Sequence, residues 1–175
     1  MSMKFSLGKS LEIIENTPAV ISVLLNNLSD DWTMANEGPN TWSVKEIVAH
    51  LIVCEETDWL PRAKIILSNT PHKTFVPIDM LGHYKLAENY SLAHLITRFQ
   101  ELRKISLTEL KSLNINEEDH LITGSHPVIG EVNLKQLIST WVAHDLAHLS
   151  QILRVMAKQY KEKVGPFKEL FTILN

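Results

Sequence analysis

The chain has 175 residues and a net charge of −3, and its basic side chains are scattered, so its electrostatics give no support for nucleic-acid binding. Its length and its hydrophobic content of 45% are those of a soluble globular protein, and we expect a single domain over residues 1–175. One cysteine, no apolar leader and no apolar run of membrane-spanning length predict a cytoplasmic protein without a membrane segment.

The first predicted helix covers Leu7–Leu28, where apolar residues recur at helical spacing. Pro18 interrupts this pattern, and Thr17-Pro18 also makes a good helix start, so we expect a kink or a restart there. The polar segment Ser29–Thr41 follows and is predicted to be a loop, because it contains Gly38-Pro39. We expect Trp42, at the end of this loop, to be a packing anchor.

A second helix is predicted over Ser43–Leu60, and Ser43 with Glu46 forms a capping box at its start. His50 lies at the edge of its apolar face, whose members are Val44, Ile47, Leu51 and Cys54. Pro61 removes a backbone donor from the continuing pattern, so we expect a kink at this position.

The remaining chain alternates two long connections with two helices. Asn69–Asn89 is long enough to be a crossover, which would let the second and third helices run parallel. The third helix is predicted over Ser91–Leu113, and Asn114–Asn133 is predicted to be irregular. The last long helix is predicted over Leu134–Tyr160, because neither glycine nor proline interrupts its amphipathic pattern. The fold class is therefore all-α.

Two histidines on the last helix point to a metal site. His144 and His148 continue its apolar stripe one turn apart, so their imidazoles can reach a common point. His50 is the candidate third ligand if the two helices pack together, and three neutral imidazoles suit zinc, nickel, iron or cobalt. Such a site keeps one position open for water or substrate. The alternative is that each histidine is a hydrogen-bonded core residue.

Other polar residues are candidates for the surroundings of this site. Asp58 is a candidate catalytic group that accepts a proton or orients a histidine, and the alternative is a solvated aspartate or an ion pair with Arg62. Arg62, His126 and Asp79 are candidates for the rim of the site or for substrate binding. Cys54 lies one turn after His50 and is expected to behave as a small apolar residue rather than as a thiolate ligand.

The remaining histidines and the H-D-x-x-H pattern are interpreted differently. His72, His83, His94 and His120 lie in polar contexts and are expected at the surface. Asp145 differs in type from the glutamate of H-E-x-x-H peptidases and is rotated about 100° from His144. We therefore expect Asp145 to face a neighbouring helix or the second nitrogen of a histidine, and we disfavour a peptidase.

The motifs T-W-S-V-K-E-I-V-A-H-L and T-W-V-A-H-D-L-A-H-L-S-Q-I resemble the DinB-like superfamily of metal-binding helical bundles. The resemblance runs over nearly the whole chain. It implies a four-helix bundle with a long crossover between the second and third helices, and three metal-binding histidines that match His50, His144 and His148. It also makes a homodimer an expected form of association, because similar bundles often pair through their helices.

The family that this chain resembles includes metal-dependent transferases or isomerases that use a low-molecular-weight thiol, such as bacillithiol, mycothiol or glutathione, and proteins assigned as metal-dependent hydrolases. The resemblance therefore predicts an enzyme with a divalent metal and a small-molecule substrate, acting as a thiol S-transferase or a hydrolase. The alternative is a non-catalytic bundle that binds a metal or a ligand in a stress response.

Overall fold

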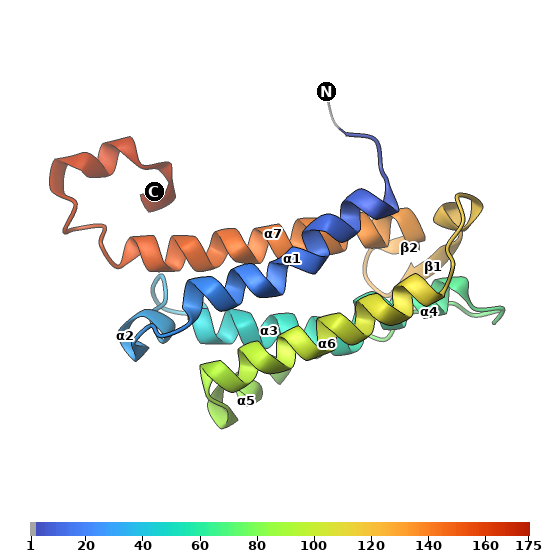
Figure 1. Ribbon diagram of the computed structural model, residues 1–175, viewed down its shortest axis with the longest axis horizontal. Helices are drawn as coiled ribbons and strands as arrows, with labels where there is room; N and C mark the ends of the chain where they lie inside the picture. Colours follow the sequence, from blue (N-terminus) through green and yellow to red (C-terminus); the bar gives the residue numbers. More distant parts are fainter. Residues whose placement is uncertain (1–2) are drawn as a thin grey trace.

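The computed structural model describes residues 3–175, and its centre is a bundle of four helical rods (Figure 1). The rods are α1 (Leu7–Leu25), α3 (Val44–Thr57) continued by α4 (Trp59–Leu67), α6 (Leu92–Ser112) and α7 (Leu134–Lys158). Both α1 and α3 pack against α6 and α7, so the core fills the space between the four rods. The predicted four-helix bundle is confirmed.

The direction of the rods also follows the prediction. Figure 1 shows α1 and α7 running in one direction and α3 and α6 in the other. The segment 68–81 returns the chain to the end of the bundle at which α3 begins, and there the short helix α5 (Gly82–Asn89) packs against α3 before α6 begins. This crossover makes α3 and α6 parallel. A further short helix, α2 (Asp30–Thr33), lies in the connection between α1 and α3.

The helix starts are fixed by side-chain caps. The predicted capping box is present: the Glu46 backbone N–H donates to Ser43 Oγ at 3.2 Å, and the Ser43 backbone N–H donates to Glu46 Oε2 at 2.7 Å. Asn133 and Gln136 form a second capping box at the start of α7. Both boxes satisfy backbone donors that a helix start would otherwise leave unpaired.

The two prolines both lie inside helices. Pro18 lies inside α1, which continues through it without a restart. The rod formed by α3 and α4 breaks at Asp58, with φ −103° and ψ −67°, rather than at Pro61. Pro61 is tolerated because it occupies the first turn of α4, where a backbone N–H has no partner within the helix.

The connection before α7 contains structure that the sequence did not predict. A short 3-10 helix, η1 (Glu118–Leu121), leads into an antiparallel hairpin of β1 (Thr123–His126) and β2 (Gly130–Asn133). The tail forms two 3-10 turns, η2 (Gly165–Leu170) and η3 (Thr172–Leu174), and η3 packs on α7. Among residues 3–175, no helix has both the length and the apolar character needed to cross a membrane.

Candidate metal centre

Three histidine side chains from two rods meet in the bundle. His144 Nε2 lies 3.2 Å from His50 Nε2 and 3.1 Å from His148 Nε2. The three donor atoms all lie within 4.8 Å of one another. His50 comes from α3, and the other two come from consecutive turns of α7, so the packing of these helices brings the three rings together.

The spacing of these nitrogens suits a small divalent ion. A tetrahedral zinc ion with metal–nitrogen bonds of about 2.0–2.1 Å holds its nitrogens about 3.3 Å apart. The two Nε2 separations of 3.2 and 3.1 Å are close to that value. His148 is further oriented by Gln151, whose Oε1 lies 2.8 Å from His148 Nδ1. A hydrogen bond at the second ring nitrogen is the usual way in which proteins fix a histidine ligand.

Burial keeps these imidazoles neutral, which is the form that binds metals. Desolvation, with a smaller contribution from the neighbouring histidines, lowers the pKa of His50 to about 4 and that of His144 to about 3. Desolvation also lowers the pKa of His148. At neutral pH all three nitrogen lone pairs are therefore available without the loss of a proton.

One side of the histidine cluster faces the core. Cys54 Sγ lies 3.4 Å from His50 Nε2 and 3.7 Å from His144 Nε2, and the ring of Trp59 stands edge-on to His144 at 4.9 Å. Cys54 and Trp59 are both buried. Burial raises the pKa of the Cys54 thiol, which is therefore protonated at neutral pH. We call these two residues the floor of the site.

Two further rings that were not predicted to belong to the site, those of Trp42 and His83, also lie against the histidines. The ring of Trp42 lies 4.7 Å from that of His50, 6.1 Å from that of His148 and 4.5 Å from that of His83. His83, on α5, was expected at the surface but is only 1% exposed. We call Trp42 and His83 the roof. The sequence offered one signal for Trp42, its position directly before the capping box that starts the helix of His50. It offered no signal for His83, because the neighbours of this residue in the sequence are polar.

The other predicted site residues form a separate cluster or lie apart. Asp58 Oδ1 accepts a hydrogen bond from Arg62 Nη2 at 2.7 Å, and the Arg62 guanidinium lies over the ring of Phe75. His126 stands edge-on to the same ring, and its Nδ1 accepts the backbone N–H of Val128. The carboxylate of Asp58 is thus paired with Arg62, which is one of the two alternatives to a catalytic role that the sequence suggested. Burial nevertheless raises the pKa of Asp58.

Asp79 lies in the crossover and is exposed. Its Oδ1 accepts a hydrogen bond from the backbone N–H of Leu81 at 2.9 Å, and this bond stabilises the turn that leads into α5. The remaining histidines expected at the surface, His72 and His94, are exposed, and His120 is half-buried.

A buried ion cluster lies beside the histidines. Arg103 of α6 donates to both carboxylate oxygens of Asp145, at 2.6 and 3.0 Å, and to Glu55 Oε1 at 2.8 Å. Asp145 therefore faces a neighbouring helix, as one of the two predicted alternatives stated. Arg103 shares the buried face of α6 with Phe99 and Leu107, and this spacing was the signal that could have identified it.

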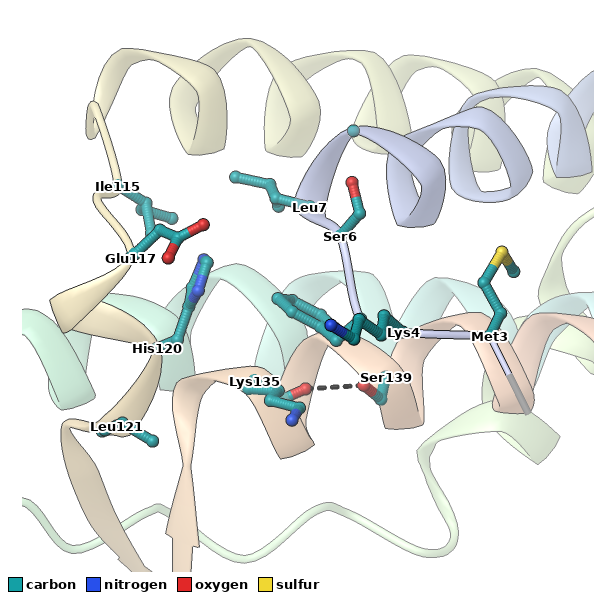
Figure 2. A pocket seen from close by; sticks show the side chains of 12 residues that line it. Met3, Lys4, Ser6, Leu7, Ile115, Glu117, His120, Leu121, Lys135 and Ser139 are labelled. Atoms are coloured by element: carbon teal, nitrogen blue, oxygen red, sulfur yellow. Dashed lines mark hydrogen bonds between the residues drawn. The ribbon is translucent and has the colours of Figure 1, made fainter. Parts of the chain in front are cut away.

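A large cavity lies elsewhere in the molecule. It has a volume of about 900 Å³ and opens between the N-terminal segment, the connection that follows α6 and the first turns of α7 (Figure 2). Phe5, His120 and Lys135 are among its lining residues, and none of the three clustered histidines lines it. The cavity and the histidine site are therefore separate features.

Comparison with known proteins agrees with this architecture. The sequence model of the DinB superfamily matches residues 13–152. The fold is similar to that of YfiT from Bacillus subtilis, with a TM-score of 0.74 and 15% identity over 91% of this chain and 92% of that chain. YfiT is described as a probable metal-dependent hydrolase with an unusual four-helix bundle topology. No curated protein sequence matches the chain.

Proposed function

The chain belongs to the DinB superfamily, and we propose that it is a metal-dependent enzyme whose His50, His144 and His148 hold a divalent ion and leave one position free for a small molecule. The observation that carries this proposal is the convergence of three Nε2 atoms from α3 and α7. Zinc, nickel and iron all suit three imidazoles, so the donor set does not select one of them.

A divalent ion with a free position supplies a Lewis acid that activates water or a thiol as a nucleophile, or polarises a carbonyl group. The protein provides the remaining conditions. Gln151 holds His148 in orientation, and Trp42 packs against His148 while Trp59 packs against His144, so the two indoles limit the access of water. A site shielded from water strengthens the electrostatic effect of the ion on its substrate.

Two reactions of the same site are supported. The structural similarity to YfiT, which is described as a probable metal-dependent hydrolase, supports hydrolysis. The resemblance to thiol-dependent members of the superfamily supports an S-transferase with a low-molecular-weight thiol as cosubstrate. Asp58 is the proposed proton acceptor in either reaction: its backbone N–H donates to the carbonyl oxygen of Cys54, the residue that contacts His50 and His144, and burial raises its pKa, which favours uptake of a proton. Arg62, His126 and Asp79 are the proposed contacts for the substrate.

The test compares activity with metal content. Purified protein is depleted of metal, reconstituted with zinc, nickel or iron, and assayed with activated esters and with small electrophiles in the presence and absence of thiols. We expect turnover only in reconstituted protein, and we expect His148→Ala to lose both the metal and the activity. The control is His72→Ala, because His72 is exposed. Full activity in His148→Ala would refute the proposal.

A second candidate function is binding without catalysis. The roof of Trp42 and His83 covers the histidines closely, an arrangement that suits a bound metal or ligand as well as a reacting substrate. The same assays separate the two functions. A non-catalytic protein would bind about one ion per chain and show no turnover with any of the substrate classes.

A further inference from the structure

His83 is a buried polar group without a hydrogen-bond partner in the described part of the chain. Its side chain is 1% exposed, and neither ring nitrogen makes a hydrogen bond of acceptable geometry within residues 3–175. A buried N–H that lacks a partner costs free energy, so such a group is rare unless a ligand or water completes its bonding. His83 therefore indicates a partner outside the protein chain.

The acidic groups that face His83 already have partners. Glu46 Oε2 accepts the backbone N–H of Ser43 at 2.7 Å and the Ser43 hydroxyl at 2.8 Å. Asp79 Oδ1 accepts the backbone N–H of Leu81. Neither carboxylate makes a hydrogen bond to the imidazole. The backbone carbonyl of Met80 also faces the ring, but no hydrogen bond of acceptable geometry joins them, so at least one ring nitrogen of His83 remains available to a bound molecule.

The position of His83 connects it to the proposed metal centre. Its ring stands edge-on to that of His50, with centroids 5.9 Å apart, and packs against Trp42 and Tyr84. Trp42 Nε1 donates to the hydroxyl of Tyr84 at 3.2 Å, which fixes the indole against α5. Among the described residues that contact the histidine cluster from this side, His83 is the one that carries an unpaired nitrogen.

His83 is placed to contact a ligand of the ion rather than the ion itself. The group of donor atoms within 4.8 Å of one another contains His50, His144 and His148 and does not include His83. Cys54 and Trp59, the floor of the site, are buried in the core, whereas Trp42 is half-buried and His83 belongs to α5, which directly follows the crossover. His83 therefore lies beside the histidine cluster without being part of it.

We propose that His83 donates a ring N–H hydrogen bond to the oxygen, nitrogen or sulfur acceptor of the small molecule that binds beside the three histidines. This inference rests on the proposed metal site and adds a binding residue to it. The ligand class is a small polar or anionic group that binds a metal and accepts a hydrogen bond at the same time, such as a carboxylate or a thiolate.

The experiment uses azide as the probe and Co²⁺ as the metal, because the visible absorption of Co²⁺ changes when an anion joins its coordination shell. Full-length protein is loaded with Co²⁺ and titrated with azide in three variants: His83→Leu removes the donor, His83→Gln restores a donor, and His94→Leu is a control at an exposed histidine of α6. Circular dichroism and the Kd for Co²⁺ are measured for each variant.

We expect His83→Leu to bind Co²⁺ with the wild-type Kd but to bind azide about tenfold more weakly, the loss expected for one hydrogen bond to a charged group. His83→Gln should recover part of this affinity, and His94→Leu should match the wild type. An unchanged azide Kd in His83→Leu would overturn the inference. A Co²⁺ Kd weakened as severely as in His50→Ala would overturn it too, because His83 would then be a metal ligand.

The outcomes also separate this inference from the proposed function. If wild-type protein binds no Co²⁺, or if His148→Ala binds it as tightly as wild type, the proposed metal site is wrong. If wild-type protein binds both Co²⁺ and azide and His83→Leu behaves identically, only the role of His83 is wrong. If His83→Leu fails to fold, His83→Gln is compared with His83→Met, which also lacks a donor. The inference requires the folded Gln variant to bind azide more tightly than the Met variant, and equal affinities would overturn it.

Discussion

Arg103 Nη1 donates a 2.6 Å hydrogen bond to the backbone carbonyl oxygen of Ile14. In an uninterrupted α-helix that carbonyl would accept the N–H of residue 18, but residue 18 is Pro18 and has no N–H. The guanidinium on α6 therefore takes the acceptor that the proline on α1 leaves free. This contact satisfies the carbonyl that Pro18 leaves without a partner, and the ion pairs with Glu55 and Asp145 balance the charge of the buried guanidinium.

The same guanidinium links the four rods. It contacts Ile14 on α1, Glu55 on α3 and Asp145 on α7, and it is carried by α6. Asp145 directly follows His144 and lies three residues before His148. Its pairing with Arg103 therefore also constrains the rotation of α7 about its axis, and with it the direction of the two histidines. We infer that this cluster helps to hold His144 and His148 toward α3.

Replacing Arg103 by methionine should destabilise the fold severely. The change leaves Asp145 and Glu55 buried without their cation, and breaking a buried pair in this way costs about 3–5 kcal/mol. Urea unfolding measures the loss. The matched control is Arg98→Met on the same helix, because the Arg98–Glu56 pair is about one-third exposed and should contribute less than about 1 kcal/mol. Equal losses in the two variants would contradict the assigned role of Arg103.

Stability should depend on pH through Glu37. Its carboxylate accepts hydrogen bonds from Arg154 at 2.7 and 2.8 Å and from Lys158 at 3.1 Å, and these contacts, led by Arg154, lower its pKa from 4.5 to about 2. Because the folded-state pKa lies below the unfolded one, the stabilisation is complete above pH 4.5 and is lost as pH falls toward 2.

Glu37→Gln should therefore be less stable than the wild type at pH 7, and the difference should shrink between pH 4.5 and 2. Urea unfolding at a series of pH values tests this, with Glu12→Gln at an exposed position of α1 as the control. A difference that stays constant across this pH range would show that the ion pair does not provide the stabilisation.

Cys54 should be dispensable for metal binding. Its sulfur contacts two of the three histidines, but the group of mutually close donor atoms does not include it. We expect Cys54→Ala to keep one ion per chain with a Kd within about threefold of the wild type, and to lose a little stability because a buried side chain is shortened. In the Co²⁺ form, an intense near-ultraviolet thiolate band that disappears in Cys54→Ala would identify Cys54 as a ligand instead.

The histidines of the site were predictable because they share the period of strong helices. His144 and His148 lie one turn apart in an amphipathic pattern, and His50 follows a capping box that fixes the start of its helix. The long connection likewise predicted the crossover, which the parallel course of α3 and α6 confirms. These features depend on local spacing, which a sequence displays directly.

The surroundings of the site were less predictable because they depend on contacts between distant segments. His83 belongs to a short helix with polar neighbours, and only the packing of α5 on α3 buries it. Arginine is a residue type that usually lies at the surface, although the spacing of Arg103 from Phe99 places it on the buried face of α6. Its pairing with Glu55 and Asp145 joins segments more than 40 residues apart, as the separations of 48 and 42 show.

The most direct test of the metal centre is elemental analysis of protein purified without chelators or nickel resin. His144 is the residue to replace, because its Nε2 lies closest to both other histidines, at 3.2 and 3.1 Å. We predict about one divalent ion per wild-type chain and per His94→Ala chain, and less than about one-tenth of that in folded His144→Ala. A wild-type chain without metal, or a His144→Ala chain that keeps its full content, would contradict the account.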